Sequence, residues 1–405
     1  MSPAATIELS ERIKRIKPSP SMVARDRARA LRAQGRDIID LTAGEPDFET
    51  PQHIKDAVVA ALAAGETRYT PVNGTPALRQ AIVAKLEREN GVRYGLDQVT
   101  VGTGAKQVIY NALVATVGEG DEVIIPAPYW VSYPDMVLAC GGTPMVVACG
   151  ENAGFKLSAE ALEGAITSKT RWVILNSPCN PTGAFYSRDE MRALADVLIR
   201  HPHVALMTDD IYEHIRFDAT EPVCPVEIEP RLKERTLLVN GVSKTYAMTG
   251  FRIGYGAGPA GLIGAMNTMQ SQSSSCVCSL GQAAAVAALN GDQGFVAEAR
   301  DAYRARRDRT VELLNAIPGM SCRSPDGAFY VYPSCSGLIG KHTPEGNTLA
   351  TDFDVVMHFL DEAGVAMVDG TAYGLSPYLR TSIATSLGEL EEACARLAQA
   401  CARLN

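Results

Sequence analysis

The chain of 405 residues is too long for one compact core, so its length predicts two domains, or one large α/β domain with an appendage. Its net charge of −8 and its lack of basic runs argue against a nucleic-acid-binding surface. No apolar run approaches the length that spans a bilayer, and the opening residues MSPAATIE do not resemble a secretory signal, so we expect a soluble, cytoplasmic protein. The ten cysteines lack zinc-ligand spacing, which favours reduced thiols over a metal site or a disulfide framework.

The first hundred residues contain helices separated by turn-rich loops. Residues 9–34 are basic and partly helical, with a break at Lys17–Pro20. A short strand at residues 37–41 leads into the loop Thr42–Asp47. Two further helices are predicted, over residues 51–64 and 77–90.

From about residue 98 the pattern becomes strand, loop and helix, repeated. The strands are apolar along their length, which indicates a mostly parallel sheet with helices on both faces. The predicted strands are 98–101, 122–125, 143–147, 171–175, 204–207, 236–239 and 253–257, and the helices include 106–117, 158–166 and 189–199. Such sheets bind ligands at the carboxyl ends of their strands, so we expect the functional site there.

A long amphipathic helix over residues 294–314 is predicted to lead into a smaller α+β domain. Its predicted elements are strands at 328–332, 365–368 and 378–383 and a final helix at 387–404. We therefore expect an N-terminal arm and part of the small domain in residues 1–48, a large domain in residues 49–295, and a small C-terminal domain in residues 296–405.

One lysine lies in a loop between two predicted strands, within the segment NGVSKTYAMTGFRIGYG (240–256). Lys244 has Ser243 beside it and Arg252 eight residues on. A lysine held among buried strands is poorly solvated, which disfavours its ammonium form and makes the amine available as a nucleophile. This prepares it for a Schiff base with a carbonyl or with pyridoxal phosphate (PLP), and the hydroxyl and guanidinium nearby suit a phosphate. A surface lysine in a polar turn is the alternative.

Two further loops follow predicted strands. Gly102-Thr-Gly-Ala-Lys106 precedes a helix, so its backbone N–H groups suit a phosphate, although a tight turn explains it equally and it lacks the nucleotide P-loop pattern. In Asn176–Gly183, two prolines and a glycine fix the backbone, and Asn180 offers a side-chain amide, unless this is simple turn chemistry.

Two charged residues are predicted in or beside buried strands. Asp209 follows strand 204–207, where a carboxylate is costly unless it is paired. A protonated pyridine nitrogen is one useful partner, because a carboxylate keeps that ring cationic, and Tyr212 would then reach the ring hydroxyl. Arg380 lies in an apolar strand of the second domain, where its planar fork suits a substrate carboxylate or, alternatively, a salt bridge between domains.

Taken together, these motifs resemble the class I aminotransferases of PLP fold type I, the aspartate aminotransferase group. The resemblance covers nearly the whole chain and is strongest at Asn176–Gly183, Asp209–Tyr212 and Ser243–Gly256, in the family's order and spacing. It implies an α/β fold in which the large domain, with a mostly parallel sheet covered by helices, binds pyridoxal 5'-phosphate and a smaller α+β domain follows.

The resemblance also implies roles for individual cofactor-binding residues. Lys244 matches the Schiff-base lysine that moves the proton between the substrate Cα and the cofactor C4′. Asp209 matches the carboxylate at the pyridine nitrogen, Asn180 and Tyr212 match the donors to the ring hydroxyl, and Trp130 matches the aromatic residue stacked on the ring. The implied phosphate ligands are Ser243, Arg252 and the backbone amides of Gly104, Ala105 and Lys106.

Substrate and partner contacts are implied in the same way. Arg380, Asn180 and the backbone of Gly44 would hold the substrate α-carboxylate, with Trp130 beside the substrate. Tyr69 resembles the tyrosine that reaches the phosphate of the neighbouring subunit, which implies a homodimer with shared active sites.

The amino-acid substrate follows from a difference within the family. The animal-type aspartate enzymes bind the distal carboxylate with an arginine of the partner subunit, but the corresponding region here, Ser271–Ser279, has none. The chain is similar instead to a bacterial subgroup in which a lysine at the position of Lys106 binds that carboxylate, helped by hydroxyls near Lys17–Ser19. We therefore expect transamination between L-aspartate and 2-oxoglutarate, giving oxaloacetate and L-glutamate by a ping-pong route through pyridoxamine phosphate. A solvated lysine at a helix start is the alternative for Lys106.

Other functions remain as alternatives. Within the PLP enzymes these are an aromatic, prephenate or broad-specificity aminotransferase, or a β-lyase or decarboxylase on the same scaffold. From another class, a PLP sensor or partner-binding module without turnover is conceivable, but such regulators carry a DNA-binding segment for which we expect no room before Lys17. A P-loop or dinucleotide enzyme lacks its motif.

Overall fold

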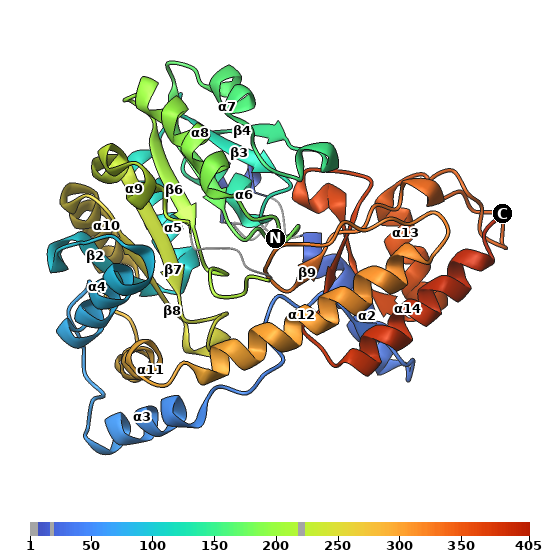
Figure 1. Ribbon diagram of the computed structural model, residues 1–405, viewed down its shortest axis with the longest axis horizontal. Coiled ribbons are helices and arrows are strands. Elements are labelled where there is room, and N and C mark those ends of the chain that lie inside the picture. Colours follow the sequence, from blue (N-terminus) through green and yellow to red (C-terminus); the bar gives the residue numbers. More distant parts are fainter. Residues whose placement is uncertain (1–6, 17–19, 218–222) are drawn as a thin grey trace, which may run out of the picture.

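The computed structural model describes residues 7–16, 20–217 and 223–405, with two lobes joined by a long helix, α12 (Gly294–Asn315) (Figure 1). The larger lobe contains the main sheet and the smaller lobe contains most of the C-terminal quarter of the chain. No helix among the described residues is long and apolar enough to cross a membrane. All ten cysteines are free thiols.

The larger lobe is organised around a seven-stranded sheet with the order β2-β8-β7-β6-β5-β3-β4. The β3, β4, β5, β6 and β7 strands pair in parallel, and only β8 runs antiparallel to its two neighbours. The predicted mostly parallel sheet is therefore confirmed. The strand bounds are β2 Val99–Thr103, β3 Glu122–Ala127, β4 Thr143–Ala148, β5 Thr170–Asn176, β6 Ala205–Asp209, β7 Thr236–Gly241 and β8 Ile253–Ala257.

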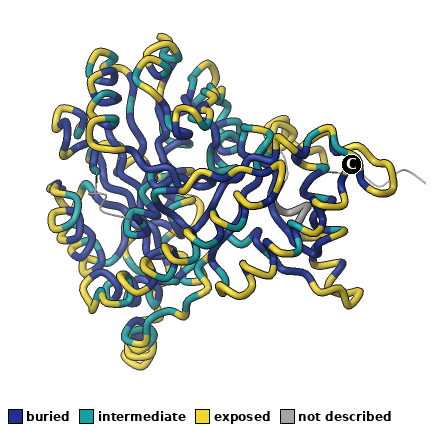
Figure 2. Tube along the Cα trace, turned by 45° about the vertical axis from the view of Figure 1, so that its right-hand side comes forward, coloured by how far each residue is buried: buried dark blue, intermediate teal, exposed yellow. Residues whose placement is uncertain are grey.

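Apolar side chains leave the central strands in both directions, so both faces of the sheet are covered by helices. On β5, Trp172 and Ile174 pack towards α5, α6 and α10, whereas Val173 and Leu175 pack towards α7 and α8. The central strands are accordingly buried along most of their length, the edge strand β4 is partly exposed, and the helices expose their outer sides (Figure 2). The helices of this lobe are α3 Gln52–Ala63, α4 Pro76–Asn90, α5 Ala105–Thr116, α6 Ser132–Ala139, α7 Ala159–Ala165, α8 Arg188–Arg200, α9 Pro225–Ile228, α10 Ala260–Ser273 and α11 Ser279–Asn290.

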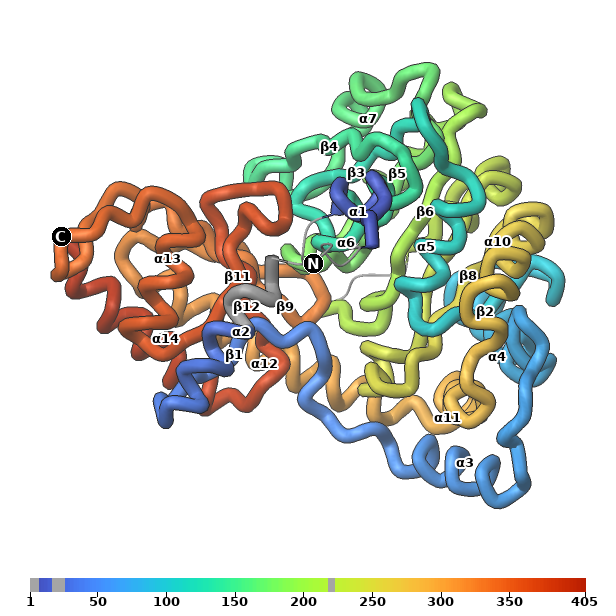
Figure 3. Tube along the Cα trace, turned by 180° about the vertical axis from the view of Figure 1, so that it is seen from behind, coloured from blue at the N-terminus to red at the C-terminus, as the bar shows by residue number. Residues whose placement is uncertain are grey.

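The smaller lobe combines segments from both ends of the chain. Ile39 pairs with Val365, so the early strand β1 lies parallel to β10 in this lobe (Figure 3). A separate antiparallel sheet has the order β11-β12-β9. The elements of this lobe are α2 Pro20–Ala33, β1 Ile39–Asp40, β9 Tyr330–Val331, α13 Asp352–His358, β10 Val365–Ala366, β11 Val368–Asp369, β12 Leu379–Ser382 and α14 Leu387–Ala402. The short helix α1 Glu11–Lys14 lies instead against α6 of the larger lobe (Figure 3). The domain limits at residues 48 and 295 stay a prediction.

Several helices were not predicted from the sequence, namely α6, α9, α10, α11 and α13. The predicted strand at 328–332 is shorter in the structure, because Ala328 has a φ of 56° and β9 begins only at Tyr330. These differences leave the sheet order unchanged and affect only what covers it.

Candidate active site

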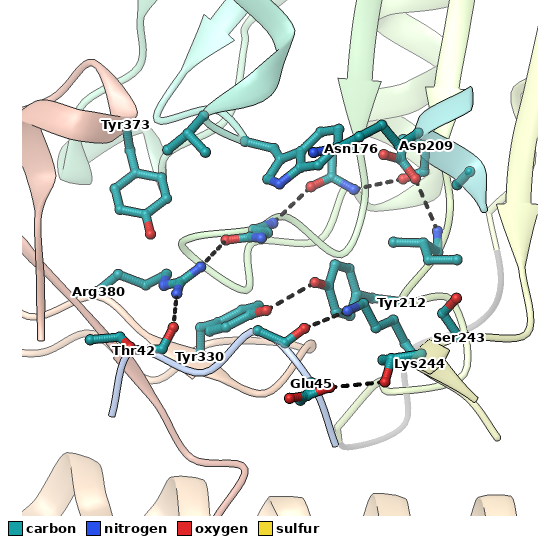
Figure 4. Close-up of a pocket in the computed structure, with 18 of the residues that line it drawn as sticks. Thr42, Glu45, Asn176, Asp209, Tyr212, Ser243, Lys244, Tyr330, Tyr373 and Arg380 are labelled. Atoms are coloured by element: carbon teal, nitrogen blue, oxygen red, sulfur yellow. Dashed lines mark hydrogen bonds between the residues drawn. The ribbon is translucent and has the colours of Figure 1, made fainter. Parts of the chain in front are cut away.

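The polar residues at the ends of the central strands meet at one edge of the sheet, facing the smaller lobe (Figure 4). Asn176 ends β5 and Asp209 ends β6, and the two residues are paired in the sheet register. The Asn176 side-chain amide donates to the backbone oxygen of Asp209 over 2.7 Å. Lys244 follows β7, which is next to β6 in the sheet.

Lys244 is the amine at the centre of this edge. Its Nζ donates to the backbone oxygen of Gly44 and lies 5.9 Å from the centre of the Phe329 ring. Burial, with a smaller contribution from the Arg252 cation, lowers the pKa of Lys244 to about 8 against the opposing effect of the Glu45 carboxylate. About one tenth of this amine is therefore neutral at pH 7, far more than for an exposed lysine, and the sequence predicted this direction from the strand-bounded loop.

Asp209 lies deep in the site and has a partner that the sequence did not indicate. The Tyr133 hydroxyl donates to Asp209 Oδ2 over 2.7 Å. Burial raises the pKa of Asp209 to about 6, although the bond from Tyr133 favours the charged form. The signal available in the sequence was the position of Tyr133, three residues after Trp130, and in the structure the centres of the two rings are 5.2 Å apart.

Tyr212 lies against an aromatic residue of the smaller lobe. Its hydroxyl is 3.0 Å from the hydroxyl of Tyr330. Burial, reinforced by Tyr330, raises the pKa of Tyr212 well above its usual value, so its hydroxyl keeps its proton and can donate.

Arg380 brings the smaller lobe to the site. Its Nη2 donates to the backbone oxygen of Thr42 over 2.6 Å and its Nη1 to Asn180 Oδ1 over 3.3 Å. The guanidinium lies 4.6 Å from the centre of the Tyr330 ring and 5.3 Å from that of Tyr373. Its Nε is buried without a hydrogen-bond partner in the described part of the chain, which leaves capacity for an anion.

A second group of donors surrounds the start of α5. Gly104 has a φ of 79°, and a Cβ there would stand 2.4 Å from Arg252 Nη2, so only glycine lets the guanidinium lie against this turn. Ser243 and Arg252 line the same cavity as the first residues of α5, whose amide groups lack intrahelical partners.

Lys106 also belongs to the start of α5 and lines the cavity. Its Nζ lies 4.7 Å from the centre of the Trp130 ring. Burial, with a smaller effect of Arg252, lowers the pKa of Lys106. The lysine therefore turns towards the cavity instead of extending into solvent.

Most of the predicted site residues line one cavity of about 350 Å³. They are Gly44, Ala105, Lys106, Trp130, Asn180, Asp209, Tyr212, Ser243, Lys244, Arg252 and Arg380. The sequence missed other lining residues, namely Thr42, Glu45, Asn176, Tyr330 and Tyr373, most of which have uncharged polar side chains that carry no pattern of their own.

Three predictions fall elsewhere. Gly104 borders the cavity through its contact with Arg252. Tyr69 does not line it, and its side chain is 91% exposed. Lys17–Ser19, predicted to supply hydroxyls, lies outside the described residues.

Comparison with known proteins decides the family, because residues 36–397 match the family model "Aminotransferase class I and II". The chain belongs to this aminotransferase family. It is 56% identical to the aspartate/prephenate aminotransferase of Cereibacter sphaeroides, over 98% of this chain and 99% of that protein. It is 53% identical to an aspartate aminotransferase of Rhizobium meliloti, over 99% and 98% of the two chains.

Solved structures agree with this assignment. The crystal structure of the Rhizobium meliloti aspartate aminotransferase matches with a TM-score of 0.97 and 52% identity, over 99% of this chain and all of that one. The Thermus thermophilus aspartate aminotransferase with maleate matches with a TM-score of 0.91 and 40% identity, over 98% and 100% of the two chains. The predicted α/β fold and the recognised family are therefore confirmed.

The residues of this aminotransferase fit PLP. The glycine turn at Gly104, Arg252 and the first amides of α5 form a cradle for a phosphate, and a Cβ at residue 104 would fill it. Asp209 offers a carboxylate for a cationic ring nitrogen, and Lys244 offers a poorly solvated amine for an aldehyde. The donor set is thus complementary to each functional group of the cofactor.

Proposed function

We propose that this aminotransferase uses PLP to exchange amino groups between L-aspartate and 2-oxoglutarate. The observation that carries the proposal is that Lys106 and Arg380, from different lobes, line one cavity together with Lys244. Aspartate and 2-oxoglutarate each carry two carboxylates, and two separate cations match them. Relatives that are 53% and 56% identical are named aspartate and aspartate/prephenate aminotransferases, which supports this choice.

Arg380 is proposed to orient the substrate through its α-carboxylate. Thr42 and Asn180 hold the two terminal nitrogens, while the ring of Tyr330 lies beside the guanidinium. Because the fork is held from several sides, an incoming carboxylate meets a preorganised donor and little side-chain entropy is lost.

Lys244 is proposed to hold the cofactor and then to take up and return the proton at the substrate Cα. When bound, PLP supplies the electron sink for that carbon. A pKa of about 8 lets Lys244 act both as a base and as an acid near neutral pH. Asp209, steadied by Tyr133, would place its negative charge at the ring nitrogen, and Tyr212 would donate to the ring hydroxyl.

Lys106 is proposed to bind the distal carboxylate. The related Thermus enzyme was solved with maleate, a small dicarboxylate, which agrees with a dicarboxylate substrate here. Prephenate, a larger dicarboxylic keto acid, is the second candidate because the 56% identical relative carries it in its name.

The test is the half-reaction of the PLP-loaded enzyme with aspartate, glutamate, phenylalanine and alanine, followed by the cofactor's visible absorbance. Lys106→Ala should lower the rate constant per molar aspartate by roughly 100-fold, the worth of one charged contact, and that for phenylalanine by much less. Lys169→Ala, which removes an exposed lysine, is the control. An equal loss of rate with aspartate and with phenylalanine would mean that Lys106 does not bind the distal carboxylate. Conversion of no amino acid at all would favour a lyase, a decarboxylase or a sensor.

We further propose that the enzyme is a homodimer whose subunits share their active sites, with Tyr69 reaching the partner's phosphate. The 91% exposure of Tyr69, and the exposed Val59 and Leu62 on the preceding helix, support a surface that another subunit covers. Mixing inactive Tyr69→Ala and Lys244→Ala enzymes tests it, because a hybrid dimer regains one intact site only if the sites are shared. A cytoplasmic location is also proposed, where the ten free thiols would stay reduced.

A further inference from the structure

The loop that carries Lys244 is connected to a buried cluster of charged residues behind the active site. Lys85 of α4 is 1% exposed, and its Nζ donates to Glu213 Oε1 and, over 2.8 Å, to Asn90 Oδ1. The Asn90 amide donates to the other Glu213 oxygen over 2.9 Å. The buried ammonium and carboxylate are therefore paired and hydrogen-bonded, which a buried ion pair needs.

This cluster contacts the chain on both sides of Lys244. Asn240, near the end of β7, donates to Glu213 Oε1 over 2.6 Å. The next residue, His214, has its Nδ1 3.2 Å from Thr245 Oγ1, and Thr245 adjoins Lys244. Glu213 and His214 in turn follow Tyr212 directly. The same cluster thus fixes the turn that carries Tyr212 and the loop that carries Lys244.

His214 is held in place from α4. Its Nε2 lies 2.9 Å from Glu89 Oε2, and its Nδ1 is 3.7 Å from Glu213 Oε1. Burial opposes the charge on Glu213, but Lys85 and then His214 outweigh it and lower its pKa to about 2. The pKa of Glu89 is also lowered, by His214 and Lys85 against the effect of burial, and Arg88 contacts the same carboxylate.

The spacing of this cluster would also suit a metal ion, since ligand atoms of Glu89, Glu213 and His214 lie within 4.8 Å of one another. However, the Lys85 ammonium bonds Glu213 and lies 3.6 Å from Glu89. A cation of the chain itself is thus already paired with both carboxylates, and the geometry favours a structural link over an ion site.

We propose that His214 is a positioning residue for Lys244, acting through its hydrogen bond with Thr245. Glu89 fixes the imidazole, the imidazole fixes the Thr245 hydroxyl, and Thr245 sets the path of the backbone at Lys244. A small displacement of a catalytic group lowers the rate strongly, so this link affects turnover more than substrate binding. The inference rests on the role proposed for Lys244 and adds the residues that set its position.

The experiment uses two matched pairs of variants. Thr245→Val keeps the shape but removes the hydroxyl, whereas Thr245→Ser keeps it. His214→Gln places an amide near the Nε2 position and keeps only the link to Glu89, whereas His214→Asn places one near Nδ1 and keeps the link to Thr245. If Thr245→Val fails to fold, the His214 pair still compares a variant that keeps the bond between residues 214 and 245 with one that loses it.

Two readouts are measured for each variant. In the loaded enzyme, Thr245→Val and His214→Gln should each lower kcat by roughly tenfold with KM changed less than about twofold, and the double variant should be no worse than either single one. In the cofactor-free protein, trace acetylation of Lys244 across pH, read by peptide mass spectrometry, should shift its midpoint by about half a pH unit or more. Thr245→Ser should match the wild type in both, and His214→Asn, which keeps the bond to Thr245 but loses the anchor on Glu89, should lie closer to the wild type than His214→Gln does.

The other charged groups that face Lys244, namely Glu45, Asp209, Arg252 and Arg380, are the same in every variant. Unchanged kcat and acetylation midpoint in Thr245→Val and His214→Gln would overturn the proposal, even if these variants unfold more easily. Equal defects in all four variants would overturn it too. If wild-type Lys244 acetylates with the same midpoint as the exposed Lys169, the role proposed for Lys244 fails first, and this inference with it.

Discussion

Replacing Lys244 by methionine should stabilise the cofactor-free protein at pH 7, although it removes the residue on which the proposed function depends. Folding transfers this ammonium from water into a poorly solvated site, which lowers its pKa from 10.5 to about 8. Each pKa unit is worth about 1.4 kcal/mol, so the charged lysine costs about 3 kcal/mol of folding free energy. Methionine has a similar shape and no charge, so it avoids this cost.

The size of the effect falls as the pH rises. Below about pH 8 the lysine is charged in both the folded and the unfolded chain, so the full cost is present. As the pH rises from 8 towards 10.5, the folded protein loses its proton before the unfolded chain does, and the cost disappears. The advantage of Lys244→Met should therefore be about 3 kcal/mol at most at pH 7, less the lost bond to Gly44, and should fall below about 1 kcal/mol by pH 10.

Urea unfolding of the cofactor-free wild type and Lys244→Met at pH 7, 8.5 and 10 measures this difference. Lys169→Met is the control, because that lysine is exposed in the folded protein, so folding does not remove its ammonium group from water. A Lys244→Met protein that is less stable than wild type at pH 7, or a difference that stays constant up to pH 10, would falsify the electrostatic account of the site.

Two further substitutions test the surroundings of the cofactor and of the substrate. Tyr133→Phe removes the 2.7 Å bond to the buried Asp209 carboxylate and should raise its pKa further; kcat should fall by roughly tenfold or more, and a pH profile identical to wild type would contradict this. Arg380→Lys keeps the charge but loses the fork held by Thr42 and Asn180, so KM should rise by roughly 10- to 100-fold for every amino acid tested, whatever its side chain; a rise for aspartate alone would move the α-carboxylate elsewhere.

The local sequence was sufficient to predict those site residues whose charge conflicts with an apolar surrounding. A carboxylate at the end of a buried strand, as at Asp209, and a guanidinium inside an apolar strand, as at Arg380, are costly without a ligand or a partner. They stand out even in a single sequence. The structure brings both to the same cavity as Lys244.

Contacts between distant segments carried no such signal. Tyr133 and Asp209 are 76 residues apart, and Lys85 and Glu213 are 128 apart, so only the folded chain shows that they meet. The missed helices have a related cause. The sequences of α10 and α11 are rich in Gly, Ala and Ser and lack charged residues, so one face differs little from the other. In α6 the signal is masked by Pro134, which a helix tolerates in its first turn.

The opposite pKa shifts of Asp209 and Lys244 have one physical origin. Burial penalises the charged form of each, raising the pKa of the acid to about 6 and lowering that of the amine to about 8. Both groups are therefore buried at a cost in free energy. A ligand that places a cationic nitrogen beside Asp209 and an electrophilic carbonyl beside Lys244 would reduce this cost. Burying these two groups lowers the folding stability of the cofactor-free protein. A ligand that satisfies both groups removes this cost, so the same free energy contributes to its binding and stabilises the folded chain.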